Sequence, residues 1–230
     1  MLTKTIIQNS VIFDIETVGA YKNFHDLQKA DQHLADLWIK RCKWLSKKED
    51  VETESPEDLW ISKSALHPEF GKIVCASFGL YENGTERVVS FYGQDEEDIL
   101  LKINKILANT RTKGLRLGGQ NIKNFDIPYI GKRMLIHGIV PDSSIQLWGK
   151  KPWEVNFLDL AEVFSFGAWG QTFTSLDLIS HVLGIPGSKD NMDGSQVHNY
   201  FWNELAYDDI KEYCEKDVVC TMKCLDRISS

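Results

Sequence analysis

Residues 5–15 form an apolar, β-branched run that contains Asp14 and is followed directly by Glu16. Such a run predicts a buried strand near the middle of a sheet. Side chains two apart on a strand point to the same face, so both carboxylates can reach one metal ion. A pair of acids in that position costs free energy unless a metal ion or polar partners neutralise it. The run therefore predicts a central strand that ends in a metal site.

The spacing of this acid pair is weak evidence by itself, because the same D-x-E pattern recurs at Asp50/Glu52 and at Asp95/Glu97. The two later copies lie in polar, acidic stretches, where hydration explains them. Only the first copy follows an apolar strand.

The rest of the chain alternates between strand-like and helix-like patterns. Asn83-Gly84, between two apolar runs, is a strong hairpin signal. The expected strands are 72–81, 85–93, 115–120 and 155–160, and the expected helices are 95–109, 126–137, 174–183 and 208–228. A hairpin combined with strand–helix crossovers predicts an α/β fold, with a mixed sheet covered by helices on both faces.

Residues 21–65 differ in character from the segments on either side. Large apolar residues recur there at helical spacing, and an acidic stretch with Pro56 then interrupts the pattern. We expect a helical insertion after the first strand, within a single domain that spans residues 1–230. The segment could line a substrate path, form a dimer contact or cap the sheet.

The net charge of −7 argues against nucleic-acid binding by bulk electrostatics, although a local basic strip can still hold phosphates. The candidate strips are Lys40, Arg41, Lys43, Lys47 and Lys48, and separately Arg111, Lys113, Arg116, Lys123, Lys132 and Arg133. The five cysteines show no paired spacing and are expected to be reduced, buried thiols. The absence of an apolar stretch long enough for a membrane span, and of a signal peptide, favours the cytoplasm.

Three further residues have side chains suited to a metal site. Asp126 lies between an expected strand and an expected helix, a position that suits either a helix cap or a ligand at a strand's carboxyl end. Tyr213 and Asp217 are four residues apart on the last expected helix, so they share one face. Taken alone, that pair could also be a surface interaction.

In combination, Asp14/Glu16 on a first strand, N-x-x-x-F-D ending at Asp126, and Y-x-x-x-D at 213–217 resemble the three motifs of DEDD exonucleases. The resemblance spans residue 11 to about residue 228, outside the insertion, and implies an RNase H-like fold with a five-stranded mixed sheet. Glu212 stands where the histidine branch has His, so the chain resembles the tyrosine branch, DEDDy. The run 189–197, together with Tyr213-Cys214, is similar to stand-alone exonucleases related to the proofreading domain of B-family DNA polymerases.

The resemblance implies hydrolysis with two divalent cations, Mg²⁺ or Mn²⁺, held by the four carboxylates. Asp14 is expected to bridge both ions, Glu16 and Asp217 to complete the ion site that activates water, and Asp126 to hold the second ion. Tyr213 is expected to orient the attacking water, because a phenol is a poor base but a good hydrogen-bond partner.

The expected substrate is the 3′ end of single-stranded DNA, with RNA 3′ ends as an alternative. Thr17, Asn121, Phe125 and Lys189 are candidate substrate contacts. Phe13, Phe125 and Trp169 could stack on bases, although each suits a core position as well. Two further alternatives stay open, a catalytically silent binding protein and an endonuclease of the RNase H type.

Overall fold

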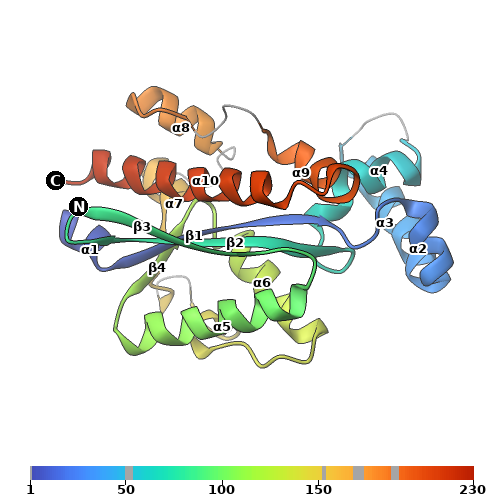
Figure 1. The fold of residues 1–230 in the computed structure, drawn as a ribbon, viewed down its shortest axis with the longest axis horizontal. Coiled ribbons are helices and arrows are strands. Elements are labelled where there is room, and N and C mark those ends of the chain that lie inside the picture. The colour runs from blue at the N-terminus through green and yellow to red at the C-terminus, as the bar shows by residue number, and fades with distance from the viewer. Residues whose placement is uncertain (1, 50–53, 152–153, 168–173, 188–191) are drawn as a thin grey trace.

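The computed structural model describes residues 2–49, 54–151, 154–167, 174–187 and 192–230. Its centre is a mixed five-stranded sheet in the order β3-β2-β1-β4-β5 (Figure 1). The strands are β1 (Ser10–Gly19), β2 (Gly71–Glu82), β3 (Thr85–Tyr92), β4 (Arg116–Gly119) and β5 (Leu158–Asp159). β1 pairs antiparallel with β2 and parallel with β4, so it is the central strand, as predicted.

The β2–β3 hairpin turns at Asn83-Gly84. Both residues have positive φ angles, 52° and 79°, which a two-residue turn of this type needs and which Asn and Gly tolerate. The turn keeps β2 and β3 in register from Glu82 opposite Thr85 to Cys75 opposite Tyr92. The predicted hairpin is therefore confirmed.

Helices cover both faces of the sheet (Figure 1). One face carries α5 (Glu96–Thr112) and α6 (Asp126–Ile136), and the other carries α7 (Leu160–Ser165), α8 (Leu176–Leu183), α9 (Val197–Asn199) and α10 (Tyr207–Ile228). Apolar side chains of β1 serve both layers, because Phe13 belongs to the core under α5 and α6 and Ile12 to the core under α10. This is the predicted α/β fold.

A separate helical lobe lies beyond the end of β1 (Figure 1). It consists of α2 (Phe24–Ala30), α3 (Gln32–Glu49) and α4 (Pro56–Lys63). Trp38 and Trp60 are fully buried at its centre, where their rings meet edge to face at 5.2 Å. The prediction of a helical insertion is thus confirmed, and its apolar stripe forms a small core of its own.

The first strand differs from its predicted extent. Residues Lys4–Gln8 form a short helix, α1, and β1 begins only at Ser10 and continues to Gly19. Asp14 and Glu16 therefore lie in the middle of the strand, with a register shift against β2 directly after Glu16. Ile7 is buried against α10 from a helical turn, and a short apolar run permits that as readily as a strand.

The cysteines, the helices and the last strand can also be compared with the predictions. All five cysteines are free and buried. Among the described helices, none is both long and apolar enough to cross a membrane. The strand expected at 155–160 shrinks to Leu158–Asp159, because α7 begins at Leu160.

Candidate active site

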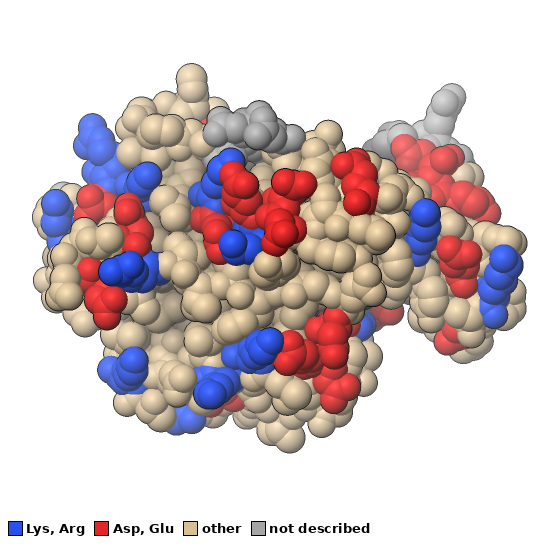
Figure 2. Space-filling view, viewed as in Figure 1, with Lys and Arg blue, Asp and Glu red and all other residues tan. Residues whose placement is uncertain are grey.

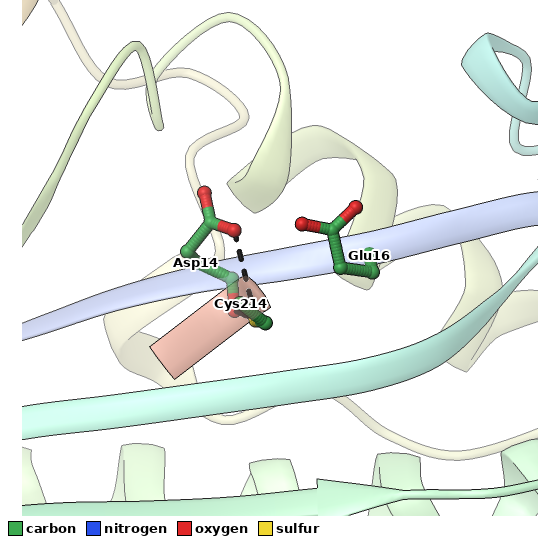
Figure 3. A group of neighbouring side chains, drawn as sticks. All are labelled: Asp14, Glu16 and Cys214. Atoms are coloured by element: carbon green, nitrogen blue, oxygen red, sulfur yellow. Dashed lines mark hydrogen bonds between the residues drawn. The ribbon is translucent and has the colours of Figure 1, made fainter. Parts of the chain in front are cut away.

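Asp14 and Glu16 project from the same side of β1 (Figure 3). Glu16 is 8% exposed and Asp14 is partly exposed. Cys214 approaches them from α10, and one potential ligand atom from each of the three residues lies within 4.8 Å of the others. The alternation of side chains along β1 thus brings the two carboxylates together, as the sequence predicts.

Asp126 joins this pair through the backbone of β1. It is the first residue of α6 and is 2% exposed. Its Oδ1 accepts the N–H of Ile15 at 3.2 Å, and Ile15 lies between the two acids of β1. The N-cap of α6 is Phe125, so Asp126 does not act as the cap. Its carboxyl group is instead directed towards the central strand.

Tyr213 and Asp217, both on α10, lie beside the two acids of β1. They are one helical turn apart, with Tyr213 8% exposed and Asp217 half-buried. The Tyr213 hydroxyl interacts with the Asp217 carboxylate, and the charges of Glu16 and Asp14 also act on it. Together with burial, these contacts raise the pKa of Tyr213 well above its ordinary value.

The electrostatics of the site favour cation binding. Burial is the main reason why the pKa values of Asp14 and Glu16 rise well above the ordinary range. The charges of Asp126 and Asp217 add to both shifts, and the charge of Asp14 adds to that of Glu16. Burial raises the pKa of Asp126 to about 7, against the opposing effect of its backbone hydrogen bonds. Within the described residues, no Lys or Arg forms an ion pair with these three acids. A divalent cation would supply the missing positive charge.

Cys214 is a site residue that the sequence did not nominate for the site, since its pattern indicated a buried thiol and a part of the Tyr213-Cys214 resemblance. Its Sγ lies 3.6 Å from Oδ2 of Asp14 and 3.5 Å from the Asp14 carbonyl oxygen, in donor geometry. Burial and the neighbouring Cys75 raise the pKa of the Cys214 thiol, so it remains protonated and donates. The only available signal was its position directly after Tyr213.

Asp159 is a second residue that sequence reasoning missed. It is 2% exposed, and its carboxylate accepts the N–H groups of Asn121, Lys123 and Ala161 at 2.9 to 3.1 Å. These bonds fix the turn before α6, in which Asn121 has a φ of 58°. Asp159 therefore positions the segment that delivers Asp126. An acid at the end of a short apolar run was the available signal.

The predicted substrate contacts lie in different environments in the structure. Phe13 is 1% exposed and stacks on Phe78, so it takes the core position that its pattern also suited and is not available to stack on bases. Thr17 is buried and donates to the Ala65 carbonyl, and Phe125 is half-buried beside the site. The Asn121 side chain accepts a hydrogen bond from Asn124. Lys189 and Trp169 lie outside the described residues.

The second basic strip is largely engaged in internal ion pairs. Arg133 is buried against Glu96, Arg111 pairs with Asp142, and Lys123 pairs with Glu162. On the face drawn in Figure 2, acidic side chains gather over α10 and at the start of α5, with basic ones interspersed. Charges of both signs therefore cover that face in place of a continuous basic strip.

Comparison with known proteins agrees with this geometry. Residues 64–227 match the family described as "Predicted 3'-5' exonuclease related to the exonuclease domain of PolB". The chain belongs to this family. The matched residues include Asp126, Tyr213 and Asp217, whereas β1 with Asp14 and Glu16 precedes them. Membership makes the protein a nuclease of the 3′–5′ exonuclease type, as the motifs predict.

Solved structures support the same fold. The chain is similar to the family B DNA polymerase from the hyperthermophilic archaeon Pyrobaculum calidifontis, with a TM-score of 0.57 and 15% identity. The similarity covers 95% of this chain and 24% of the polymerase chain, so this protein corresponds to about a quarter of that enzyme's length. A search of curated proteins found no match. The predicted RNase H-like fold is confirmed.

Proposed function

We propose that this chain is a metal-dependent exonuclease that hydrolyses single-stranded DNA from its 3′ end. Asp14, Glu16, Asp126 and Asp217 would hold two divalent cations. The observation that supports this is the convergence of acids from β1, α6 and α10, where no described basic side chain pairs with Asp14, Glu16 or Asp126. The preference for DNA draws on the family's stated relation to PolB and on the polymerase with a similar fold.

The ligand chemistry fits Mg²⁺ or Mn²⁺. The four acids offer hard oxygen atoms, which these ions prefer, and the Cys214 thiol is protonated and therefore a poor ligand. Bound cations would lower the pKa of the attacking water and neutralise charge that develops on the phosphate. The chain's own task is to hold the acids, the water and the scissile phosphate in line.

Tyr213 would orient the attacking water. Its raised pKa keeps the phenol protonated at neutral pH, so it can donate a hydrogen bond but cannot serve as a base. Its place beside Asp217 and Glu16 directs the hydroxyl towards the carboxylates.

Two buried groups would keep the acids in position. The Cys214 thiol donates to Asp14, and the Ile15 N–H donates to Asp126, so each bond fixes one carboxylate oxygen. A carboxylate held this way loses less rotamer freedom when it meets a cation. Both contacts would therefore strengthen cation binding without touching substrate.

The test is an assay on 5′-labelled DNA and RNA single strands of the same sequence, with Mg²⁺, Mn²⁺ or EDTA. We expect the wild type with either metal to shorten DNA stepwise from the 3′ end, and to degrade RNA more slowly. EDTA should stop the reaction, and Asp217→Ala should nearly abolish it.

The other outcomes separate the rival functions. Equal or faster loss of RNA would contradict the DNA preference and favour an RNA-trimming enzyme. Internal cuts in place of a ladder from the 3′ end would indicate an endonuclease. Labelled strands that stay intact with the wild type and both metals would indicate a binding protein that has lost catalysis.

A further inference from the structure

A groove separates the helical lobe from α6. Its volume is about 710 Å³, and one wall is the outer side of α3 while the other is the first turns of α6. We call it the lobe groove, and its distinctive side chains are Lys40, Arg41, Trp44, Leu66, Phe125 and Lys132. The groove exists because the lobe packs beside the sheet at the end of β1 and leaves the start of α6 open.

The lobe groove is locally basic in an acidic protein. Three lining residues are basic and one, Glu69, is acidic, although the chain as a whole carries a charge of −7. Within the described residues, neither Lys40 nor Arg41 has a carboxylate at ion-pair distance. Lys132 pairs with Glu69, but both side chains are about half exposed, at 53% and 52%. Such an exposed pair is weak and exchanges readily for a phosphate.

The groove also presents flat and apolar surface. Trp44 is 49% exposed and Leu66 is 52% exposed. The Arg41 guanidinium lies 4.6 Å from the Trp44 ring centroid, and its Nη2 is 3.2 Å from Nδ1 of His67. Burial and Arg41 lower the pKa of His67, so its neutral ring accepts the bond and leaves the guanidinium charge uncompensated. Aromatic surface beside unpaired cations suits unstacked bases on a phosphate backbone.

The lobe groove is joined to the carboxylate site by short, fixed connections. The Ala65 carbonyl, at the end of the lobe, accepts hydrogen bonds from Thr17 Oγ1 and from the Tyr129 hydroxyl, each at 2.9 Å. Thr17 directly follows Glu16, and Phe125 in the groove wall directly precedes Asp126. A strand lying in the groove would therefore lead to the acids.

We propose that the lobe groove binds single-stranded nucleic acid on the 5′ side of the scissile bond, so that the insertion supplies the enzyme's grip on its substrate. This inference rests on the proposed function and assigns it a binding surface. Lys40, Arg41 and Lys132 contact phosphates, while Trp44 and Leu66 carry bases.

The test measures affinity for a fluorescein-labelled single strand by anisotropy in EDTA, which prevents cleavage. The variants are Lys40→Ala/Arg41→Ala and Trp44→Ala, and Lys43→Ala is the matched control, since Lys43 is exposed on the same helix but does not line the groove. We expect the double variant and Trp44→Ala each to bind about tenfold more weakly, and Lys43→Ala to stay within about twofold of the wild type. The double variant should also flatten the slope of log affinity against log salt by about 1.4, for two lost phosphate contacts. Thermal melting verifies that each variant is folded.

Two results would overturn the inference, and a third would separate it from the proposed function. Unchanged affinity in both folded groove variants would remove the groove from the substrate path, even if the wild type shortens strands as proposed. A wild-type dimer that Trp44→Ala dissociates, with affinity intact, would make this face a contact between copies. A wild type that binds through the groove but never cleaves would contradict the proposed function and leave the groove a nucleic-acid site.

Discussion

The carboxylate site and the helical lobe lie next to each other, but they differ in how well their buried polar groups are paired. In the lobe, Trp38 and Trp60 are fully buried, and each donates its indole N–H to a backbone carbonyl at 2.9 Å. At the site, Asp14 and Glu16 lie close together on one strand, with pKa values raised by burial and by carboxylate charge. The two buried indole N–H groups of the lobe are thus paired, whereas carboxylates that repel one another lie together at the site.

This difference indicates that the carboxylate site serves activity and that the lobe core serves stability. Sites that hold like charges together cost stability, and the rest of the fold has to offset that cost. Substitutions at the site should therefore lower activity and spare or raise stability, whereas substitutions in the lobe core should do the reverse.

The largest expected effect comes from Asp14→Asn. Loss of a central ligand should reduce the exonuclease rate by roughly a thousandfold or more, because bound cations provide several kcal/mol of transition-state stabilisation. The melting temperature in EDTA should stay the same or rise, because one like charge is removed. Rates from the labelled-strand assay and melting curves measure both. Asp36→Asn, at an exposed acid of α3, is the control. A large drop in melting temperature would contradict the contrast.

Trp38→Ala should give the opposite pattern. Truncating this fully buried ring, which also contacts Phe70 at 5.0 Å, should lower the free energy of unfolding by about 3–5 kcal/mol. Hydrolysis of a small nucleotide ester should change little under folding conditions, since that substrate reaches only the carboxylates. Urea titration measures the loss. Trp44→Ala, at a half-exposed ring, should cost no more than about 1 kcal/mol. Similar losses in both variants would mean that the lobe has no core of its own.

A smaller effect concerns pH. The pKa of Asp126 is about 7 in the folded protein and 3.8 as its ordinary value, so the folded state retains a proton that the unfolded state releases. This contribution is complete below the ordinary value and is lost as pH rises through about 7, by up to about 4 kcal/mol. Metal-free wild type should therefore lose stability between about pH 5 and about pH 8.

Asp126→Asn removes that contribution, together with the part of the Asp14 and Glu16 pKa shifts that the Asp126 charge causes. The amide oxygen can still accept the Ile15 N–H. The variant should lose less stability than the wild type over the same range. His67 and His198 have lowered pKa values and act in the opposite direction, but they are present in both proteins and cancel. Urea titrations in EDTA across this range provide the comparison. Parallel profiles for the two proteins would show that Asp126 does not titrate there.

Much of the fold follows from local signals, and the failures have local reasons. Asn83-Gly84 fixes its hairpin because the turn geometry depends on those two residues alone. Ser175 and Gly184 bound α8 as a cap and a left-handed terminator, close to the predicted limits. The helix α1 was missed because Ile7 is buried by contact with α10, far along the chain. No local pattern records that contact.

The site shows the same division. The order of Asp14, Glu16, Asp126, Tyr213 and Asp217 along the chain was sufficient to nominate them, and the fold brings their elements together. The supporting roles of Cys214 and Asp159 depend on hydrogen bonds across 200 and 38 residues, respectively. The lobe groove combines basic residues from both predicted strips, because α3 and α6 face each other only in three dimensions. The metal-binding role of the acids and the substrate-binding role of the groove residues remain predictions.

The Ala65 carbonyl ties the lobe, the end of β1 and α6 into one rigid joint. If a strand is held in the lobe groove, the distance from that hold to the acids is constant and acts as a ruler. A chain shorter than the ruler cannot occupy both places at once. Digestion would then slow sharply at a characteristic length and leave short oligonucleotides as the end product, a limit set by architecture and independent of base sequence.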